Sequence, residues 1–150
     1  MKRVLVLGST GSIGRQALQV VASSSSLTVV GLSCDRNVPL LLEQAASLGV
    51  HEVAVADSAA AQRISPALYP ELHVRTGPGA AAQLVREVEA DIVLNAIVGF
   101  AGLESTLAAL EKACPVALAN KESLVSAGSL VTDLARKHKT MLLPVDSEHS

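Results

Sequence analysis

The sequence predicts a doubly wound α/β fold, with a mostly parallel sheet and helices on both of its faces. Short runs rich in Val, Leu and Ile alternate with longer segments of helical periodicity along all 150 residues, as in chains built from strand–helix–strand units. Apolar residues make up 49% of the chain but aromatic residues only 1%, so the core must be aliphatic. An aliphatic core suits buried parallel strands covered by Ala-rich helices.

The first half of the chain gives strands at residues 4–7, 27–32 and 53–56, each a β-branched or Leu-rich run. Apolar residues three and four positions apart predict a helix at 13–22. A second helix is expected at 39–48, because Pro39 suits a first helical turn and Gly49 suits the position after the last. Asp57 or Ser58 should cap a further short helix.

The second half continues the alternation. A small strand is possible at 72–74, and helices are expected at 79–89, 103–113 and 126–139. Strands are expected at 91–96, 115–119 and 141–143. Polar clusters follow several of these strands, and open α/β sheets bind ligands at the carboxyl ends of their strands.

Composition excludes several classes of protein. A formal net charge of −2 and the lack of a Lys/Arg run give no attraction for nucleic acid. No apolar stretch approaches the length of a membrane span, and the four apolar residues before Gly8 are too few for a signal peptide. Cys34 and Cys114 fit neither a metal knuckle nor a disulfide framework, so we expect buried free thiols. Together these features predict a cytoplasmic protein without nucleic-acid or membrane partners.

Residues 8–14, Gly-Ser-Thr-Gly-Ser-Ile-Gly, directly follow the first strand and open the first helix. Glycines at this position permit a tight turn, close approach of the backbone to a pyrophosphate, and close packing of the helix on the strand. The helix N-terminus adds N–H groups and a positive dipole end. A merely structural turn is the alternative, and the absence of a P-loop lysine argues against nucleoside triphosphate hydrolysis. The context predicts a Rossmann-like dinucleotide site.

Residues 33–37, Ser-Cys-Asp-Arg-Asn, end the second strand, where NAD and NADP are distinguished. Arg36 could pair with the 2′-phosphate of NADP, reinforced by Ser33 and Asn37. Asp35 has the charge that holds the ribose 2′-OH of NAD. The local sequence favours NADP only slightly.

Two further clusters follow later strands. Asn120, Lys121, Glu122 and Ser123 could cap the next helix, or they could belong to a polar active site with Lys121 as a cationic donor. The small and apolar segment 95–102 could let the backbone approach a flat cofactor, or it could be a plain strand–helix turn.

Asp146 and Glu148 stand two residues apart after the last apolar run. In an extended segment they project from the same face, so both carboxylates can aim at one point. Two hard oxygen ligands are the start of a Mg²⁺ or Mn²⁺ site, although a solvated loop or helix cap is the alternative. The cluster indicates one domain of a larger enzyme, ending where its active site begins.

Three motifs together resemble one enzyme family. Residues 8–14, residues 118–125 (Leu-Ala-Asn-Lys-Glu-Ser-Leu-Val) and residues 143–150 (Leu-Pro-Val-Asp-Ser-Glu-His-Ser) are similar to 1-deoxy-D-xylulose 5-phosphate reductoisomerases. The resemblance runs the length of the chain but covers only the amino-terminal domain of the family. It implies a homodimeric enzyme of non-mevalonate isoprenoid biosynthesis that uses NADPH and Mn²⁺ or Mg²⁺. Such an enzyme converts 1-deoxy-D-xylulose 5-phosphate to 2-C-methyl-D-erythritol 4-phosphate by skeletal rearrangement and hydride transfer.

The resemblance also implies roles for individual residues. The cofactor diphosphate would lie against the glycine turn, the 2′-phosphate would be read at the end of the second strand, and further cofactor contacts would come from the 118–125 motif. The diphosphate contacts would be Gly8, Thr10, Gly11, Ser12 and Ile13. The 2′-phosphate would be bound by Arg36 and Asn37, and the further cofactor contacts would be Asn120 and Glu122. Lys121, Ser147 and Glu148 would contact the substrate, and Asp146 and Glu148 would bind the metal. Asp35 departs from the family, which more usually has Gly or Ala there.

The third metal carboxylate, the substrate-phosphate pocket and the lid of the family would lie beyond Ser150. We therefore expect residues 1–150 to form an NADPH-binding domain that is inactive by itself. Two alternatives remain open from the residues alone. One is the cofactor domain of another NAD(P)-dependent dehydrogenase, and the other is a non-enzymatic nucleotide-binding module.

Overall fold

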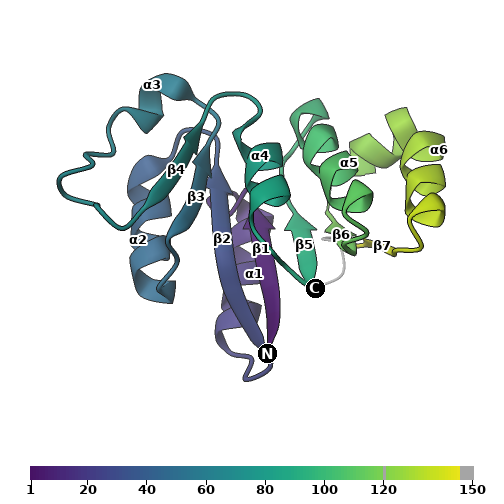
Figure 1. The fold of residues 1–150 in the computed structure, drawn as a ribbon, viewed down its shortest axis with the longest axis horizontal. Helices are drawn as coiled ribbons and strands as arrows, with labels where there is room; N and C mark the ends of the chain where they lie inside the picture. The colour runs from purple at the N-terminus through teal and green to yellow at the C-terminus, as the bar shows by residue number, and fades with distance from the viewer. Residues whose placement is uncertain (120, 146–150) are drawn as a thin grey trace.

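A computed structural model describes residues 1–119 and 121–145, and within these ranges it leaves the side chains of residue 100 and residues 121–126 undescribed. The described strands are β1 (Lys2–Leu7), β2 (Leu27–Cys34), β3 (Glu52–Val55), β4 (His73–Thr76), β5 (Ile92–Asn95), β6 (Val116–Leu118) and β7 (Leu142–Pro144). They form one sheet in the order β4-β3-β2-β1-β5-β6-β7, and every neighbouring pair is parallel (Figure 1). The predicted doubly wound fold is confirmed.

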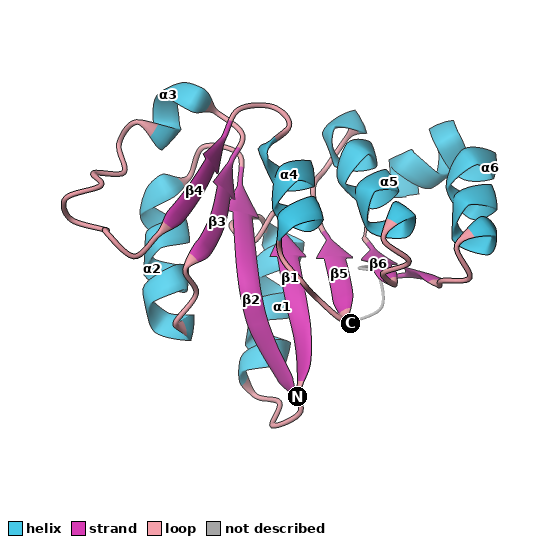
Figure 2. Cartoon of the chain, viewed as in Figure 1, coloured by secondary structure: helices cyan, strands magenta, loops and turns pink. Residues whose placement is uncertain are grey.

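Helices cover both faces of this sheet (Figure 2). They are α1 (Ser12–Ala22), α2 (Val38–Leu48), α3 (Ser58–Ala61), α4 (Ala80–Glu87), α5 (Leu103–Glu111) and α6 (Lys121–Lys137), with a 3₁₀ turn η1 (Phe100–Gly102) before α5. The helices α1 and α2 lie behind the sheet in this view, and α4, α5 and α6 lie in front of it. Each crossover connection carries the chain from the carboxyl end of one strand back to the amino end of the next, so the strands all run in one direction.

The central strand β1 supplies both layers of the core. Its side chains alternate between the two faces with a period of two. Val4 and Val6 belong to the apolar cluster under α1 and α2, whereas Leu5 and Leu7 belong to the cluster under α4 and α5. Because all four are buried, this strand lacks the polar alternation of a half-exposed strand, as expected for a parallel sheet covered on both faces.

The helix boundaries expected from capping residues are confirmed in α2 and α3. Pro39 lies in the first turn of α2, and Gly49 ends it in the left-handed conformation at φ 68°. Asp57 caps α3 by accepting a hydrogen bond from the Ala60 N–H at 3.0 Å. The capping residues alone were therefore enough to predict the end of α2 and the start of α3.

Most element bounds differ from the predicted ones by one or two residues, and the differences at α6 and η1 are larger. The edge strand β4 runs from His73 to Thr76, slightly beyond the expected 72–74. The helix α6 begins at Lys121 instead of Ser126, and its backbone is not helical at Ala127 (φ −134°, ψ 26°). The start signal at Ser126 therefore coincides with an interruption inside the helix. The 3₁₀ turn η1 was not predicted, because its backbone is shaped by contacts with β5 that no local pattern reveals.

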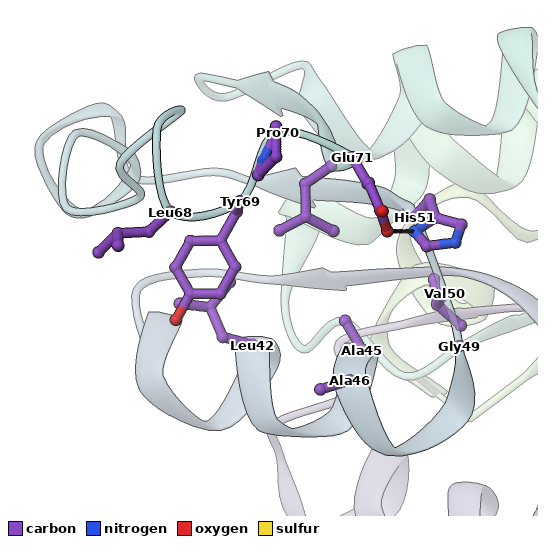
Figure 3. A pocket seen from close by; sticks show the side chains of 11 residues that line it. Leu42, Ala45, Ala46, Gly49, Val50, His51, Leu68, Tyr69, Pro70 and Glu71 are labelled. Carbon is purple, nitrogen blue, oxygen red and sulfur yellow. Dashed lines mark ion pairs between the residues drawn. The ribbon is translucent and has the colours of Figure 1, made fainter.

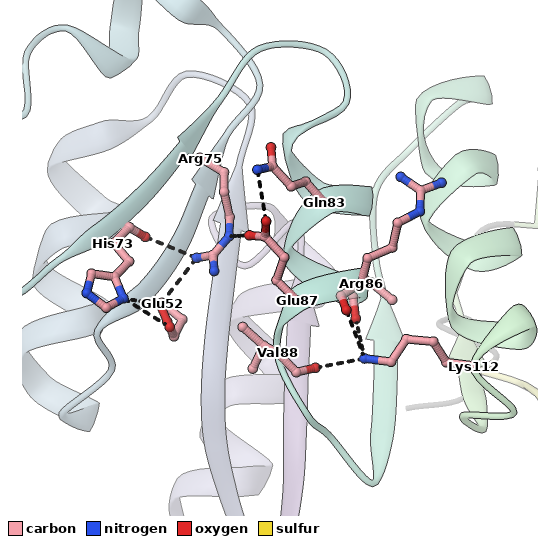
Figure 4. Close-up of polar contacts among 9 residues, drawn as sticks. Glu52, His73, Arg75, Gln83, Arg86, Glu87, Val88 and Lys112 are labelled. Carbon is pink, nitrogen blue, oxygen red and sulfur yellow. Dashed lines mark hydrogen bonds and ion pairs between the residues drawn. The ribbon is translucent and has the colours of Figure 1, made fainter.

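Charged side chains tie the front helices to the edge of the sheet (Figure 4). Arg75 of β4, whose side chain is 11% exposed, donates to Glu87 Oε1 at 2.7 Å and to Glu52 Oε2 at 3.3 Å. Lys112, the C-cap of α5, donates from Nζ to the Val85 carbonyl at 2.8 Å, in the last turn of α4. A cation there satisfies helix carbonyls and complements the helix dipole. These contacts join β4 to α4, and α4 to the end of α5.

Within the described ranges, no helix combines the length and the apolar character that crossing a membrane requires.

Candidate cofactor-binding site

The loop after β1 occupies the point where the winding of the sheet reverses. From β1 the chain builds outward to β2, β3 and β4, and then crosses to β5 on the other side of β1. The loops after β1 and β5 therefore separate to opposite faces and leave a crevice at their carboxyl ends. The predicted glycine turn lies at this crevice.

The three glycines of the turn have different surroundings. Gly8 has φ 73°, and a Cβ added to it would lie 2.8 Å from the Ala96 carbonyl oxygen. A Cβ on Gly14 would collide with the backbone of Gly8 and Ser9. Gly11 has no positive φ, and its Cβ would lie 3.6 Å from Gly8 O, an ordinary contact. The surrounding protein thus requires glycine at positions 8 and 14. At position 11 it does not, and the space there is open to a ligand.

The N-termini of α1 and α4 both lack a side-chain cap at the crevice, and that of α1 is the one that follows the glycine turn. Gly11 is its N-cap, no side chain caps the helix, and its first turn contains no acidic residue. By contrast, Asn37 and Asp57 cap α2 and α3 with their side chains. An uncapped N-terminus presents N–H groups and a positive dipole end, which fit the diphosphate of a dinucleotide.

Two buried serines and the half-buried Gln44 anchor the glycine turn to β2 and α2. Ser33 Oγ accepts from Gly8 N at 2.9 Å, and Ser9 N donates to Ser33 O at 2.8 Å. Ser9 Oγ donates to Gln44 Oε1 at 2.8 Å, while Gln44 Nε2 donates to Ser9 O at 2.9 Å. Ser33 is 2% exposed and supports the turn, and its predicted part in a 2′-phosphate contact stays a prediction. The sequence analysis did not predict that Gln44 supports the glycine turn. The sign in the sequence was a polar residue in a largely apolar helix.

A cavity of about 310 Å³ opens beside the turn. Its lining comes from the glycine turn, the carboxyl ends of β2 and β3, the start of α4 and the segment after β5. These residues are Gly8, Thr10, Gly11, Ser33, Cys34, Asp35, Ala56, Pro78, Ala81, Ala96, Ile97, Val98 and Ala101. The contribution of Pro78 and Ala81 was not predicted, because only the packing of α4 against the sheet brings them there. From the small, apolar segment 95–102, Ala96, Ile97, Val98 and Ala101 form an apolar wall of the cavity.

Asn95 shapes that wall. Its side chain is fully buried and donates to the Gly102 carbonyl and to Thr106 Oγ1, both at 2.8 Å. Its Oδ1 accepts from Ile97 N at 3.1 Å. A Cβ on Gly102 would lie 2.9 Å from Ile97 O, so the turn closes tightly on itself. A satisfied buried amide of this kind fixes the backbone around it.

Cys34 faces the cavity as a neutral thiol. It is buried and free, as predicted, and Cys114 is likewise buried and free. Burial, followed by the neighbouring charge of Asp35, raises the pKa of the Cys34 thiol to about 11. A low dielectric disfavours the thiolate, so Cys34 contributes apolar surface and no nucleophile.

The predicted readers of the 2′-position lie at the end of β2. Asn37 Oδ1 accepts from Leu40 N at 3.3 Å and so caps α2. Arg36 is exposed and its Nε lies 3.6 Å from Asp35 Oδ2 and 4.0 Å from Asp57 Oδ2. Asp35 lines the cavity, whereas Arg36 and Asn37 do not line it.

The downstream candidates are only partly described. Lys121 and Glu122 form the first turn of α6, but their side chains are not described. Asn120, Asp146, Ser147 and Glu148 lie outside the described residues.

The backbone beside these candidates lies at the carboxyl edge of the sheet. Ala119 N donates to Asn95 O at 3.0 Å, and Val145 N donates to Leu118 O at 2.9 Å. The residues that immediately precede Asn120 and Asp146 thus lie at the same edge as the crevice. In the part of the chain that is described, no three His, Cys, Asp or Glu side chains cluster as a metal site.

A second cavity, of about 390 Å³, lies between α2 and the loop before β4 (Figure 3). Leu42, Leu68 and Tyr69 contribute apolar surface, and His51 Nδ1 lies 3.8 Å from Glu71 Oε2. This cavity borders Val50 and His51, at the amino end of β3. Ligands of open α/β sheets bind at the other edge, so the cavity beside the glycine turn is the candidate site.

Known proteins resemble the chain along nearly its whole length. A family model described as 1-deoxy-D-xylulose 5-phosphate reductoisomerase matches residues 4–128. The 1-deoxy-D-xylulose 5-phosphate reductoisomerase of Rhodococcus jostii (strain RHA1) is 56% identical over 151 residues, which cover 99% of this chain and 36% of the relative. The chain thus spans about a third of the length of that curated relative.

Solved structures of reductoisomerases have the same fold. The enzyme from Zymomonas mobilis in complex with NADPH has a TM-score of 0.90 at 41% identity, covering 99% of this chain and 39% of that one. A structure in complex with NADPH, fosmidomycin and magnesium has a TM-score of 0.87 at 33% identity, covering 99% of this chain and 37% of that one.

Proposed function

Because the chain belongs to the 1-deoxy-D-xylulose 5-phosphate reductoisomerase family, we propose that it forms the NADPH-binding domain of such an enzyme. The resemblance seen in the sequence motifs is thereby confirmed at the level of the family. The observation that carries the proposal is the turn at Gly11, which leaves space before an uncapped helix N-terminus beside the cavity. That arrangement suits a dinucleotide diphosphate.

The binding roles follow the geometry of the crevice. The N–H groups at the start of α1, with Thr10, Gly11, Ser12 and Ile13 around them, would hold the diphosphate. Gly8 lets the turn pass close to β5. Arg36 and Asn37 would bind near the adenosine 2′-position, although Asn37 is also the cap of α2. The apolar wall around residues 96–101 would exclude water from the bound cofactor.

The proposed reaction is conversion of 1-deoxy-D-xylulose 5-phosphate to 2-C-methyl-D-erythritol 4-phosphate, with hydride supplied by NADPH. Asn120 and Glu122 are proposed to contact the cofactor, and Lys121, Ser147 and Glu148 the substrate. In support, Ala119 and Val145, the described residues just before these segments, are hydrogen-bonded at the carboxyl ends of β5 and β6.

Asp146 and Glu148 are proposed as ligands of a divalent cation. Their carboxylates are the hard oxygen donors that Mg²⁺ or Mn²⁺ prefers. The preceding residue, Val145, is hydrogen-bonded to the end of β6, so the ligand segment starts at the correct edge of the sheet. When bound, the cation would polarise substrate oxygens.

A calorimetric titration of the chain with NADPH tests the proposal directly. We expect saturable binding of one NADPH per chain. The Gly14→Ala variant is unsuitable as a negative control, since it disturbs the fold, whereas Gly11→Ala changes the ligand-facing position. Absence of binding by a chain whose circular dichroism shows a folded α/β protein would refute the proposed function.

A further inference from the structure

The charges at the end of β2 bear on which nicotinamide coenzyme the site accepts. We infer that Asp35 is a specificity-determining residue that weakens the preference for NADPH and lets the same site bind NADH. The inference rests on the proposed function, because it concerns the adenosine end of that coenzyme site. It follows from the placement of three charged side chains, Asp35, Arg36 and Asp57.

Asp35, and not Arg36, faces the cavity. Asp35 is among the residues that line it, directly after Ser33 and Cys34 at the end of β2. An acidic residue in this position accepts hydrogen bonds from the adenosine ribose hydroxyls of NADH. The Asp35 side chain is 70% exposed, so its carboxylate is accessible to a ligand.

Arg36, the cation that would read a 2′-phosphate, is shared between two carboxylates. Its Nε lies 3.6 Å from Asp35 Oδ2 and 4.0 Å from Asp57 Oδ2. Asp57 is held in place because it caps α3 through Ala60 N. A 2′-phosphate that binds Arg36 must therefore approach two carboxylates together with the one guanidinium.

The Asp35 carboxylate should affect the affinities of NADPH and NADH in opposite directions. The 2′-phosphate of NADPH is repelled by Asp35 and meets an Arg36 that is already partly neutralised. NADH carries no 2′-phosphate and gains a hydrogen-bond acceptor from the same carboxylate. Removing the Asp35 charge should strengthen NADPH binding and weaken NADH binding.

The test is calorimetric titration of the chain and of its Asp35→Asn variant with NADPH and with NADH. Exposed charge pairs change affinity only modestly, so we expect each affinity to move about two- to fivefold, in opposite directions. The NADPH-to-NADH affinity ratio should rise by about fourfold or more from these paired changes. Asp133→Asn is the matched control, because Asp133 is 71% exposed, lies 3.8 Å from Arg136 and belongs to α6. That variant should leave the ratio unchanged.

An Arg36→Ala variant provides a second arm that does not depend on Asp35→Asn folding well. It should lose NADPH affinity about tenfold or more, as expected for a charge-assisted contact, and keep or improve NADH affinity. An unchanged or lowered ratio in Asp35→Asn, or no NADH binding by the unmodified chain while NADPH binds, would overturn the inference alone. Binding of neither coenzyme would overturn the proposed function together with it.

Discussion

Gly8, Gly11 and Gly14 follow one spacing rule, yet the fold requires only two of them. Gly8 needs its left-handed backbone and its close approach to Ala96, and Gly14 needs the space between α1 and the preceding turn. Gly11 has neither constraint. The sequence pattern alone treats the three as equivalent, because it records spacing and not the atoms around each Cα.

This difference predicts that one alanine variant mainly loses stability and the other mainly loses NADPH affinity. Gly14→Ala should destabilise the fold by about 1–3 kcal/mol, since the new methyl group meets backbone that must move. Gly11→Ala should cost less than about 1 kcal/mol of stability, since Ala is a poorer N-cap than Gly, but lower NADPH affinity at least about tenfold, because the methyl group occupies ligand space. Urea denaturation and calorimetric titration of both variants measure these effects. Equal losses of stability in the two variants would contradict this reading of the turn.

Cys34 should be unreactive near neutral pH although it lines the cavity. With a pKa of about 11, the thiol is almost entirely protonated at pH 8, and only the thiolate reacts quickly. In a Cys114→Ser background, reaction with a disulfide reagent at pH 8 should be about a hundredfold slower for the folded than for the denaturant-unfolded chain. A folded-state rate equal to the unfolded rate would show that the thiol is not buried as described.

The same shift links Cys34 to stability at alkaline pH. The folded-state pKa lies above the ordinary value of 9.0, so the neutral thiol favours the folded state below pH 9. This contribution is lost as pH rises through about 11, because the folded state resists the deprotonation that the unfolded state undergoes. The measured rate of thiol modification should rise over the same interval.

At the scale of elements, the segment between β5 and α5 acts as one unit organised by Asn95. The sequence indicated a small, apolar segment but gave no sign that a buried amide would determine its shape. The hydrogen bonds from Asn95 to Gly102, Thr106 and Ile97 join the strand end to the helix start. This unit is the wall of the cavity, so its shape determines what the cavity accepts.

Asn95→Ala should destabilise the protein by about 3 kcal/mol, since it leaves several buried polar groups without partners. It should also weaken NADPH binding by loosening the wall. Thr106→Val is the graded control, because it removes one acceptor and leaves the Asn95 bonds to Gly102 and Ile97 in place. Its cost should be about 1 kcal/mol. Equal costs for the two variants in urea denaturation would contradict an organising role for Asn95.

At the scale of the whole molecule, residues distant in sequence meet at a single edge of the sheet. The turn at residues 8–11, the acid at 35, the start of α4 and the segment after β5 border the same cavity. They meet because every strand runs in one direction, which brings all carboxyl ends together. A ligand in this crevice would contact elements from both halves of the sheet and should stabilise them jointly.

NADPH should therefore raise the melting temperature of the chain. At a free concentration of a hundred times the dissociation constant, the stabilisation is about 2.7 kcal/mol, which corresponds to roughly 5–10 °C for a chain of this size. Differential scanning fluorimetry with and without NADPH measures the shift. The Gly11→Ala variant is the control, and an equally large shift in that variant would show that NADPH binds elsewhere.

The chain by itself should bind NADPH without turning over substrate. It spans about a third of the length of its reductoisomerase relative, and the proposed metal ligands at 146 and 148 are only two. Two carboxylates hold a divalent cation weakly. Assay of NADPH oxidation with 1-deoxy-D-xylulose 5-phosphate and Mn²⁺ should give no rate above background. Measurable turnover would contradict this expectation.

Local patterns along the chain were enough to predict the strands and most helices, the capped ends of α2 and α3, and the glycine turn after β1. Each depends on side-chain periodicity or on a few adjacent residues, so the information is present in the order of amino acids. The roles of Ser33 and Gln44, the contribution of α4 to the cavity and the approach of Arg36 to Asp57 depended on the packed fold. Those properties arise between residues that are far apart in sequence, and burial and distance exist only once the sheet and its helices have assembled.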